Sequence, residues 1–264
     1  MPRPFDSIIT PELTSPGRYR CDLPEGWKQG RGLFGGLVTA VMTRALEAQA
    51  PDRPLRSLTA ELCGPLQPGE VQVIVETLRE GNAVTTATVR LEQSGQVQAH
   101  GVGVMGKARV TDRDGVYLDR PKPPDWRTIE SAAVEPPLGP EFGPHFDFRV
   151  ERFFPMSGDK TGATEGWIRL KDAGKTRDAA LLAAYADAWW PVLLTMEEGP
   201  RPMATIAYTF QPFVHFEGLN PEAPFFFRAK LAAASDGYAV ELRELWGEDG
   251  RLLALNQQTF CIIK

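Results

Sequence analysis

The chain of 264 residues is long enough for one large domain or two small ones. Apolar residues make up 42% and charged residues 24%, a balance typical of a globular fold rather than a disordered or collagen-like chain. With 29 basic and 34 acidic residues, the net charge of -5 disfavours a nucleic-acid-binding surface, which is normally basic.

Three cysteines lie far apart in the sequence: Cys21, Cys63 and Cys261. A sparse and odd set is typical of a reducing compartment, and its spacing predicts no metal site. The N-terminal residues lack the apolar segment of a secretory signal. The most apolar helical stretch, 179–194, is too short to span a bilayer and is interrupted by Asp187 and Pro191. We therefore expect a cytoplasmic protein without a membrane or nucleic-acid partner.

The first part of the chain predicts a helix followed by four antiparallel strands. The helix covers 34–50 and begins at a pair of glycines. Apolar and polar residues then alternate with period two, and many are β-branched, as half-buried strands require. Short turns join these segments, which is typical of hairpins. The four predicted strands are 55–63, 70–79, 83–93 and 96–106.

A proline-rich segment separates this part from the rest. Seven of the residues from 109 to 144 are proline. Proline at this density removes strand donors and ends helices. We predict a long connection that packs as an extended strap.

The second part repeats the pattern of the first. After extended segments at 146–154 and 164–170, a helix is predicted over 177–194. Four more strands follow it: 203–213, 224–233, 238–246 and 252–263.

Two local alignments support a duplication, one joining positions 57 and 205 (an offset of 148) and one joining 95 and 250 (an offset of 155). A long helix with an apolar face must pack against such a sheet. The sequence thus predicts an α+β fold with a first repeat at 1–108, a connection at 109–145 and a second repeat at 146–264.

Four segments carry a family resemblance, and they occur in the family's order. They are GLFGGLVTA (32–40), AAYADAWWPVLL (183–194), MATIAYTFQPF (203–213) and LALNQQTF (253–260). Together they resemble the acyl-CoA thioesterase II-like family of double-hotdog thioesterases. The resemblance covers most of the chain outside the connection. It implies a double hotdog, with each antiparallel sheet wrapped around a long helix, that hydrolyses acyl-CoA-type thioesters in fatty acid metabolism without a cofactor.

Asp187 is the first candidate catalytic residue. On a helix, its neighbours would be small or apolar residues such as Ala183, Ala184 and Trp190. Burial there would raise the pKa of Asp187 and make it a better base near neutral pH. The alternative is an aspartate at a helix bend that backbone amides stabilise. The resemblance places Asp187 where such thioesterases carry their catalytic aspartate.

Gln258 lies in the last predicted strand, where strand alternation puts Asn256 and Gln258 on one face and Gln257 on the other. An amide side chain both donates and accepts hydrogen bonds, so it can hold a water molecule without titrating. The alternative is a polar strand edge. The family pattern matches Gln258, and the first repeat has Gly103 there, so the predicted site occurs once.

Thr205 opens the predicted strand at 203–213, and its hydroxyl can orient a water molecule or a carboxylate. The family has Ser or Thr here, followed by an aliphatic residue, and Thr205–Ile206 conforms. The next two family positions are commonly Asp-His, but this chain has Ala207 and Tyr208. That departure leaves open how far the family's activity carries over.

The glycines Gly35 and Gly36 precede the first helix, where exposed amides can polarise a carbonyl oxygen. Alternatively, they only let the helix approach the sheet closely. The family has a similar FGG segment, which implies an oxyanion site. We expect an apolar acyl tunnel beside the helices, lined by Phe34, Trp189 and Trp190.

Two other patterns are set aside. The segment at 101–108 matches Gly-x-Gly-x-x-Gly, but the residues after it cannot form the helix that a phosphate-binding loop needs. No Gly-x-Ser-x-Gly motif supports a serine nucleophile. The histidines are predicted to be surface or core residues: His100, His145 and His215.

Two other functions stay open at this stage. One is a hotdog enoyl-thioester hydratase or dehydratase, whose motif usually pairs an aspartate with a nearby histidine. The other is a non-catalytic acyl-thioester-binding protein. In each case the partner is a small acyl thioester, and edge strands of such folds leave a homodimer open.

Overall fold

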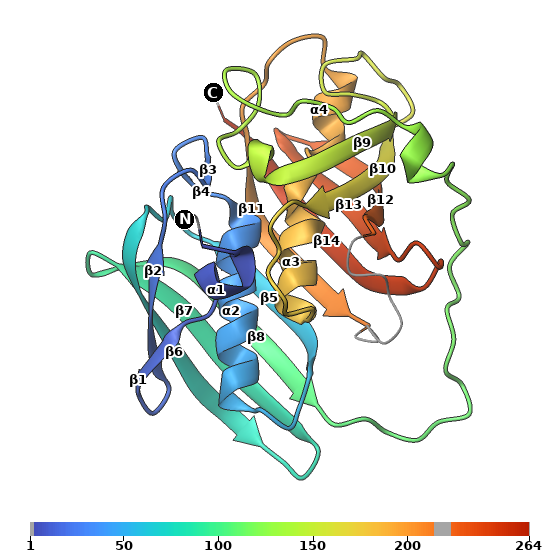
Figure 1. The fold of residues 1–264 in the computed structure, drawn as a ribbon. Helices are drawn as coiled ribbons and strands as arrows, with labels where there is room; N and C mark the ends of the chain where they lie inside the picture. Colours follow the sequence, from blue (N-terminus) through green and yellow to red (C-terminus); the bar gives the residue numbers. More distant parts are fainter. Residues whose placement is uncertain (1–2, 214–222, 264) are drawn as a thin grey trace.

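The computed structural model of the protein describes residues 3–213 and 223–263. Its main sheet has twelve antiparallel strands in the order β1-β2-β6-β7-β8-β5-β11-β14-β13-β12-β10-β9. Helices α2 (Gly35–Gln49) and α3 (Ala179–Ala188) pack against each other, and the sheet curves around them (Figure 1). The halves join where β5 pairs with β11. The predicted double hotdog is therefore confirmed, with both repeats sharing one continuous sheet.

The first half contains the predicted helix and four strands, within about two residues of their expected bounds. Its strands after α2 are β5 (Leu55–Leu62), β6 (Gly69–Glu80), β7 (Val84–Gln93) and β8 (Gln96–Gly106). The elements before α2 were not predicted: α1 (Phe5–Ile8), β1 (Glu12–Ser15), β2 (Arg18–Leu23), β3 (Lys28–Gln29) and β4 (Gly32–Leu33). Strict alternation in β2, which buries every second residue, was the signal available for it.

The second half begins with two strands before α3, and four strands follow the helices. Its elements besides α3 are β9 (Phe146–Arg152), β10 (Ala163–Leu170), α4 (Val192–Met196), β11 (Met203–Pro212), β12 (Phe225–Ser235), β13 (Tyr238–Trp246) and β14 (Leu252–Ile262). All six strands agree with the sequence prediction to within about two residues.

The prediction of one helix over 177–194 is wrong, because the helix is broken in its middle. Trp189 is extended, with φ -80° and ψ 147°, and α4 begins only after Pro191. Proline lacks an amide hydrogen and disfavours a helical conformation in the residue before it. The stretch 179–196 is apolar enough to cross a membrane by composition, but 78% of it is buried inside the fold. It is a core element, and the break places Asp187 in the last turn of α3.

Matching β-bulges show that the two halves share one register. In β5 the bulge lies between Leu55 and Ser57, and in β11 it lies between Thr205 and Ala207. Leu55 is paired with Met105, and Thr205 is paired with Phe260. The structural offset between β8 and β14 is therefore the predicted 155 (105 to 260), whereas that between β5 and β11 is 150 (55 to 205) instead of 148.

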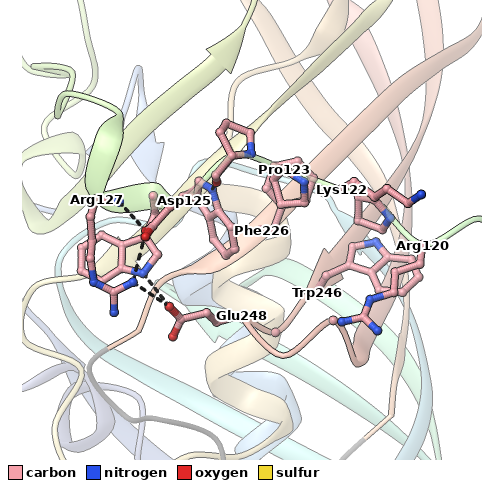
Figure 2. Close-up of a pocket in the computed structure, with 14 residues that line it drawn as sticks. Arg120, Lys122, Pro123, Asp125, Arg127, Phe226, Trp246 and Glu248 are labelled. Atoms are coloured by element: carbon pink, nitrogen blue, oxygen red, sulfur yellow. Dashed lines mark hydrogen bonds and ion pairs between the residues drawn. The ribbon is translucent and has the colours of Figure 1, made fainter.

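The later part of the connection between the halves lies against the outer face of the second half, whereas residues 107–118 are exposed (Figure 1). Residues 107–125 form neither helix nor strand. The indole of Trp167 donates to the carbonyl of Pro124 at 3.1 Å, and Arg228 donates to the carbonyl of Asp119 at 2.8 Å. Figure 2 shows the pocket beneath this strap, where Arg127 forms ion pairs with Asp125 and Glu248. The strap thus covers an apolar cluster on that face: Trp167, Phe226, Trp246 and Leu252.

Candidate active site

A cavity of about 510 Å³ lies between the two halves, where both contribute to its wall. The β3–β4 hairpin, the start of α2, the end of α3 and the start of β11 all reach it. Its wall is mostly apolar, with Asp187 as its one carboxylate among the described residues. The other lining residues that the argument uses are Arg31, Leu33, Gly35, Val38, Leu62, Met203, Thr205, Ile206 and Phe260.

The carboxylate of Asp187 meets the N-terminus of α2. The amide of Gly36 and the side chain of Gln258 both act on this carboxylate and lower its pKa. A β-carbon added to Gly35 would lie 2.7 Å from Oδ2 of Asp187, which is closer than side-chain atoms normally approach. The glycine pair therefore lets the positive end of α2 approach the charge directly.

The pKa of Asp187 is raised above its ordinary value, and burial is the largest cause. Only 7% of the residue is exposed. The positive charge of Arg243 and the hydrogen bonds from Gln258 and the Gly36 amide act in the opposite direction and lower this pKa. A carboxylate with a raised pKa is a stronger base near neutral pH than an exposed one.

Thr205 lies in the cavity wall, and Gln258 lies behind that wall. The hydroxyl of Thr205 donates to Oε1 of Gln258 at 2.9 Å, and Nε2 of Gln258 donates to Oδ1 of Asn256 at 3.0 Å and to the carbonyl of Ala186 at 3.4 Å. The side chain of Gln258 also acts on Asp187 and lowers its pKa. Gln258 is 0% exposed, so it supports the wall without lining it. The bulge in β11 at Ile206 allows Thr205 and Ile206, which are neighbours in sequence, both to reach the cavity.

The departure from the family pattern at Ala207 and Tyr208 lies outside the cavity wall. Tyr208 is fully buried, and its hydroxyl donates to the carbonyl of Ala183 in α3 at 2.9 Å. Burial and the nearby charge of Asp187 raise the pKa of Tyr208 well above its ordinary value. Tyr208 is thus a neutral tie between β11 and α3.

Two charged residues beside the site were not predicted from the sequence. Glu241 and Arg243 lie on β13 and are almost completely buried. The available signal was their position in the period-two alternation of the strand, which places both on the same face as the apolar residues Ala239 and Leu245. Two opposite charges at buried positions of one strand are unusual outside an ion pair.

The predicted acyl-tunnel residues lie in the core instead. Phe34 stacks on Phe142 with ring centroids 4.1 Å apart, and the indole of Trp189 donates to Thr164 at 3.0 Å. Trp190 is 8% exposed and packs on Trp189. In the part of the chain that the structure describes, none of Phe34, Trp189 and Trp190 lines the cavity. Their aromatic character indicated that they are buried, but not that they face the core rather than the cavity.

The histidines in residues 3–213 and 223–263 lie away from the cavity wall. His100 is 3.8 Å from a carboxylate oxygen of Glu61, and the ring of His145 stacks on Trp27 at 4.0 Å. The third histidine, His215, lies outside the described residues. Within those same ranges, no three acidic, histidine or cysteine side chains cluster as metal ligands.

Comparison with known proteins supplies the family. Residues 23–106 match the family model of the acyl-CoA thioesterase N-terminal domain, and residues 114–262 match that of the acyl-CoA thioesterase C-terminal domain. No curated protein matches the chain.

Solved structures match over almost the whole chain. A conserved protein of unknown function with a hot dog fold from Alicyclobacillus acidocaldarius is 21% identical, with a TM-score of 0.85 and 98% of each chain covered. A candidate thioesterase II from Thermobifida fusca YX is 23% identical, with a TM-score of 0.84 and coverage of 100% of this chain and 99% of that one. The acyl-CoA thioesterase II TesB2 from Mycobacterium marinum is 16% identical, with a TM-score of 0.77 and 98% of each chain covered. At these identities, the likeness establishes the fold.

Proposed function

Because this chain belongs to the acyl-CoA thioesterase family, a family of thioester hydrolases, we propose that its cavity hydrolyses acyl-CoA-type thioesters with Asp187 as the general base. The observation that carries this assignment is one buried carboxylate, with a raised pKa, in a mostly apolar wall between the two halves. The products are a free acid and a thiol.

Asp187 and Thr205 would hold the attacking water. The hydroxyl of Thr205 donates its hydrogen bond to Gln258, so the lone pairs of its oxygen are left to accept one. A water that donates to both Asp187 and Thr205 has its lone pairs directed into the cavity. As its oxygen bonds to the thioester carbon, its proton passes to Asp187. The carbon–sulfur bond then breaks and the thiolate takes this proton, so no acyl-enzyme is needed.

The oxyanion donor in this mechanism is the amide of Gly35. The first amides of a helix have no acceptor within it, and Gly35 lines the cavity. The amide of Gly36, the second predicted oxyanion residue, acts instead on Asp187 and lowers its pKa. One well-placed donor to a developing oxyanion is worth about 10²–10³ in rate.

The acyl chain would lie along the apolar wall rather than against Phe34, Trp189 and Trp190. Leu33, Val38, Leu62, Met203, Ile206 and Phe260 form that wall. Arg31 also lines the cavity and is its one cationic residue among those described. Its guanidinium suits the phosphate groups of coenzyme A.

The test is an acyl-CoA panel with thiol release followed by a dye, on wild type and D187N together. Asparagine keeps the size of the side chain but cannot take a proton from water. We expect D187N to fold and to lose thiol release for every chain length. Wild-type turnover by D187N would refute the mechanism.

The same panel tests the two other functions. A hydratase would consume the enoyl absorbance of a crotonyl thioester without releasing thiol, but the described cavity wall holds no histidine to pair with Asp187. A non-catalytic binder would bind acyl-CoA tightly and release no thiol at any chain length.

A further inference from the structure

Two oppositely charged side chains are buried beside the helix end that carries Asp187. Glu241 and Arg243 are two positions apart on β13, so they share its inner face, and their exposed fractions are 0% and 2%. Nε and Nη2 of Arg243 donate to Oε1 of Glu241 at 2.9 and 2.7 Å. Burial removes the hydration of both ions, so stability alone is a weak reason for such a pair.

The pair joins the two sides of the break between α3 and α4. Nη1 of Arg243 donates to the carbonyl oxygens of Ala186 and Trp189 at 2.9 and 3.3 Å. Oε2 of Glu241 accepts the amide of Val192, the first residue of α4, at 2.6 Å. The last carbonyls and first amides of helices have no partner within the helix. One ion pair therefore satisfies the end of α3 and the start of α4 together.

Arg243 also acts on the charge of Asp187. The C-terminal end of a helix is partially negative, which disfavours a carboxylate in its last turn. The positive charge of Arg243 opposes both this effect and burial, and it lowers the pKa of Asp187. The other titratable groups coupled to Asp187 are Glu241 on β13 and Tyr208 on β11, whose pKa values its charge raises. Helix α2 contributes the amide of Gly36.

The first half of the chain provides an internal comparison. Glu241 pairs with Gln258 and Arg243 pairs with Asn256 in the β13–β14 ladder. In the β7–β8 ladder, whose register and bulge match, the equivalent positions are apolar or glycine: Ala87 paired with Gly103, and Val89 paired with Gly101. The fold thus accepts uncharged residues at these positions, and the polar network belongs to the half that carries the site.

We propose that Glu241 and Arg243 are positioning residues that fix the end of α3 and keep the carboxylate of Asp187 placed and charged for water activation. The proposal rests on the function proposed above for Asp187. Neither residue lines the cavity, so neither touches the substrate.

The test uses the residues of the first half. E241A/R243V introduces the residue types of the equivalent positions Ala87 and Val89. It removes both charges of the ion pair together, so neither is left buried without the other. We expect a folded protein in which kcat falls by about tenfold or more while KM changes little, because the base is misplaced and binding surfaces are not. We also expect the acid limb of kcat/KM to move to higher pH, because the cation near Asp187 is gone. A folded variant with wild-type kcat and acid limb would overturn the proposal.

A second variant separates charge from geometry. R243K keeps the positive charge but lacks the planar fork that binds Glu241 and two carbonyls together. We expect the acid limb to stay near that of wild type while kcat falls. A wild-type kcat in R243K would overturn the positioning role, even if E241A/R243V does not fold.

The matched control removes an ion pair from the outer face of the same sheet, between Arg228 on β12 and Glu244 on β13. Arg228 and Glu244 pair at 2.6 Å on the outer face of the sheet, beside Trp246. R228V/E244A should keep the kcat and acid limb of wild type. The result for D187N separates the two proposals: an active D187N refutes the proposed function, whereas an inactive D187N beside a wild-type-like E241A/R243V refutes only the positioning role.

Discussion

Replacing Gly35 with alanine tests the close approach of α2 to the proposed base. The added methyl would lie 2.7 Å from Oδ2 of Asp187 and 3.0 Å from Cδ1 of Leu62. Carbon atoms in ordinary contact lie about 3.5–4.0 Å apart, so the carboxylate or the helix must move by several tenths of an ångström. The same methyl would narrow the cavity next to the proposed oxyanion donor.

The magnitude follows from how sharply catalysis depends on placement. A misplacement of 1 Å costs about 10²-fold in rate, so we expect kcat of G35A to fall by roughly 10- to 100-fold. Stability should change little, because alanine is a better helix former than glycine by up to about 1 kcal/mol, which offsets part of the strain.

The assay is thiol release from acyl-CoA, with the melting temperature followed by circular dichroism. G199A is the control, because Gly199 has open space around its α-carbon and lies outside the cavity wall. If G35A folds and keeps kcat within twofold of wild type, the carboxylate does not depend on this approach and the reasoning fails.

Three further predictions concern the same cavity. T205V keeps the side-chain size but lacks the hydroxyl that would hold the water, so kcat should fall about tenfold or more with little change in KM. A raised KM with an unchanged kcat would indicate a binding role instead. R31Q should raise KM for acyl-CoA but not for the matching acyl-pantetheine thioester, and an equal rise for both would exclude phosphate recognition. The folded protein raises the pKa of Asp187 above its ordinary value of 3.8. Between that value and the raised pKa, the folded protein therefore binds more protons than the unfolded chain. Its stability falls as the pH rises through this range. D187N should therefore have a higher melting temperature than wild type at neutral pH, and an unchanged melting temperature would contradict the cost of burying this charge. For the wild-type enzyme, kcat/KM should rise with pH through the pKa of Asp187.

Local pattern alone determined most of the secondary structure. Period-two alternation identified the four strands that follow the helix in each half, because a strand that covers a core buries every second side chain. The same alternation placed Asn256 and Gln258 on one face of the strand and Gln257 on the other, and in the structure the face of Asn256 and Gln258 is the buried one. The order of elements, which occurs twice, agrees with the double hotdog that the family resemblance implied. Strand β2 carried the same signal and was missed.

The contacts at the site were decided by the tertiary structure. Family resemblance nominated Asp187, Thr205 and Gln258. In the fold Thr205 donates a hydrogen bond to Gln258, and Gln258 lowers the pKa of Asp187. Sequence could not assign the Gly36 amide to Asp187, because that contact joins the two halves across α2 and α3. A sequence pattern indicates on which face of its helix or strand a residue lies, but not which residues of another element pack against that face.

Glu241 and Arg243 show the same limit most clearly. Strand alternation is consistent with both side chains facing inward, but it does not show which groups they bind. The role of the pair depends on the backbone carbonyls and the amide with which it forms hydrogen bonds. Those groups exist because Pro191 breaks the helix, and the break lies on a different element. Likewise, Trp189 and Trp190 are aromatic and buried, as the sequence indicates, but the turn between α3 and α4 directs them into the core and away from the cavity. The sequence by itself thus determined the elements and their order, whereas the packing between elements decided which side chains share the site.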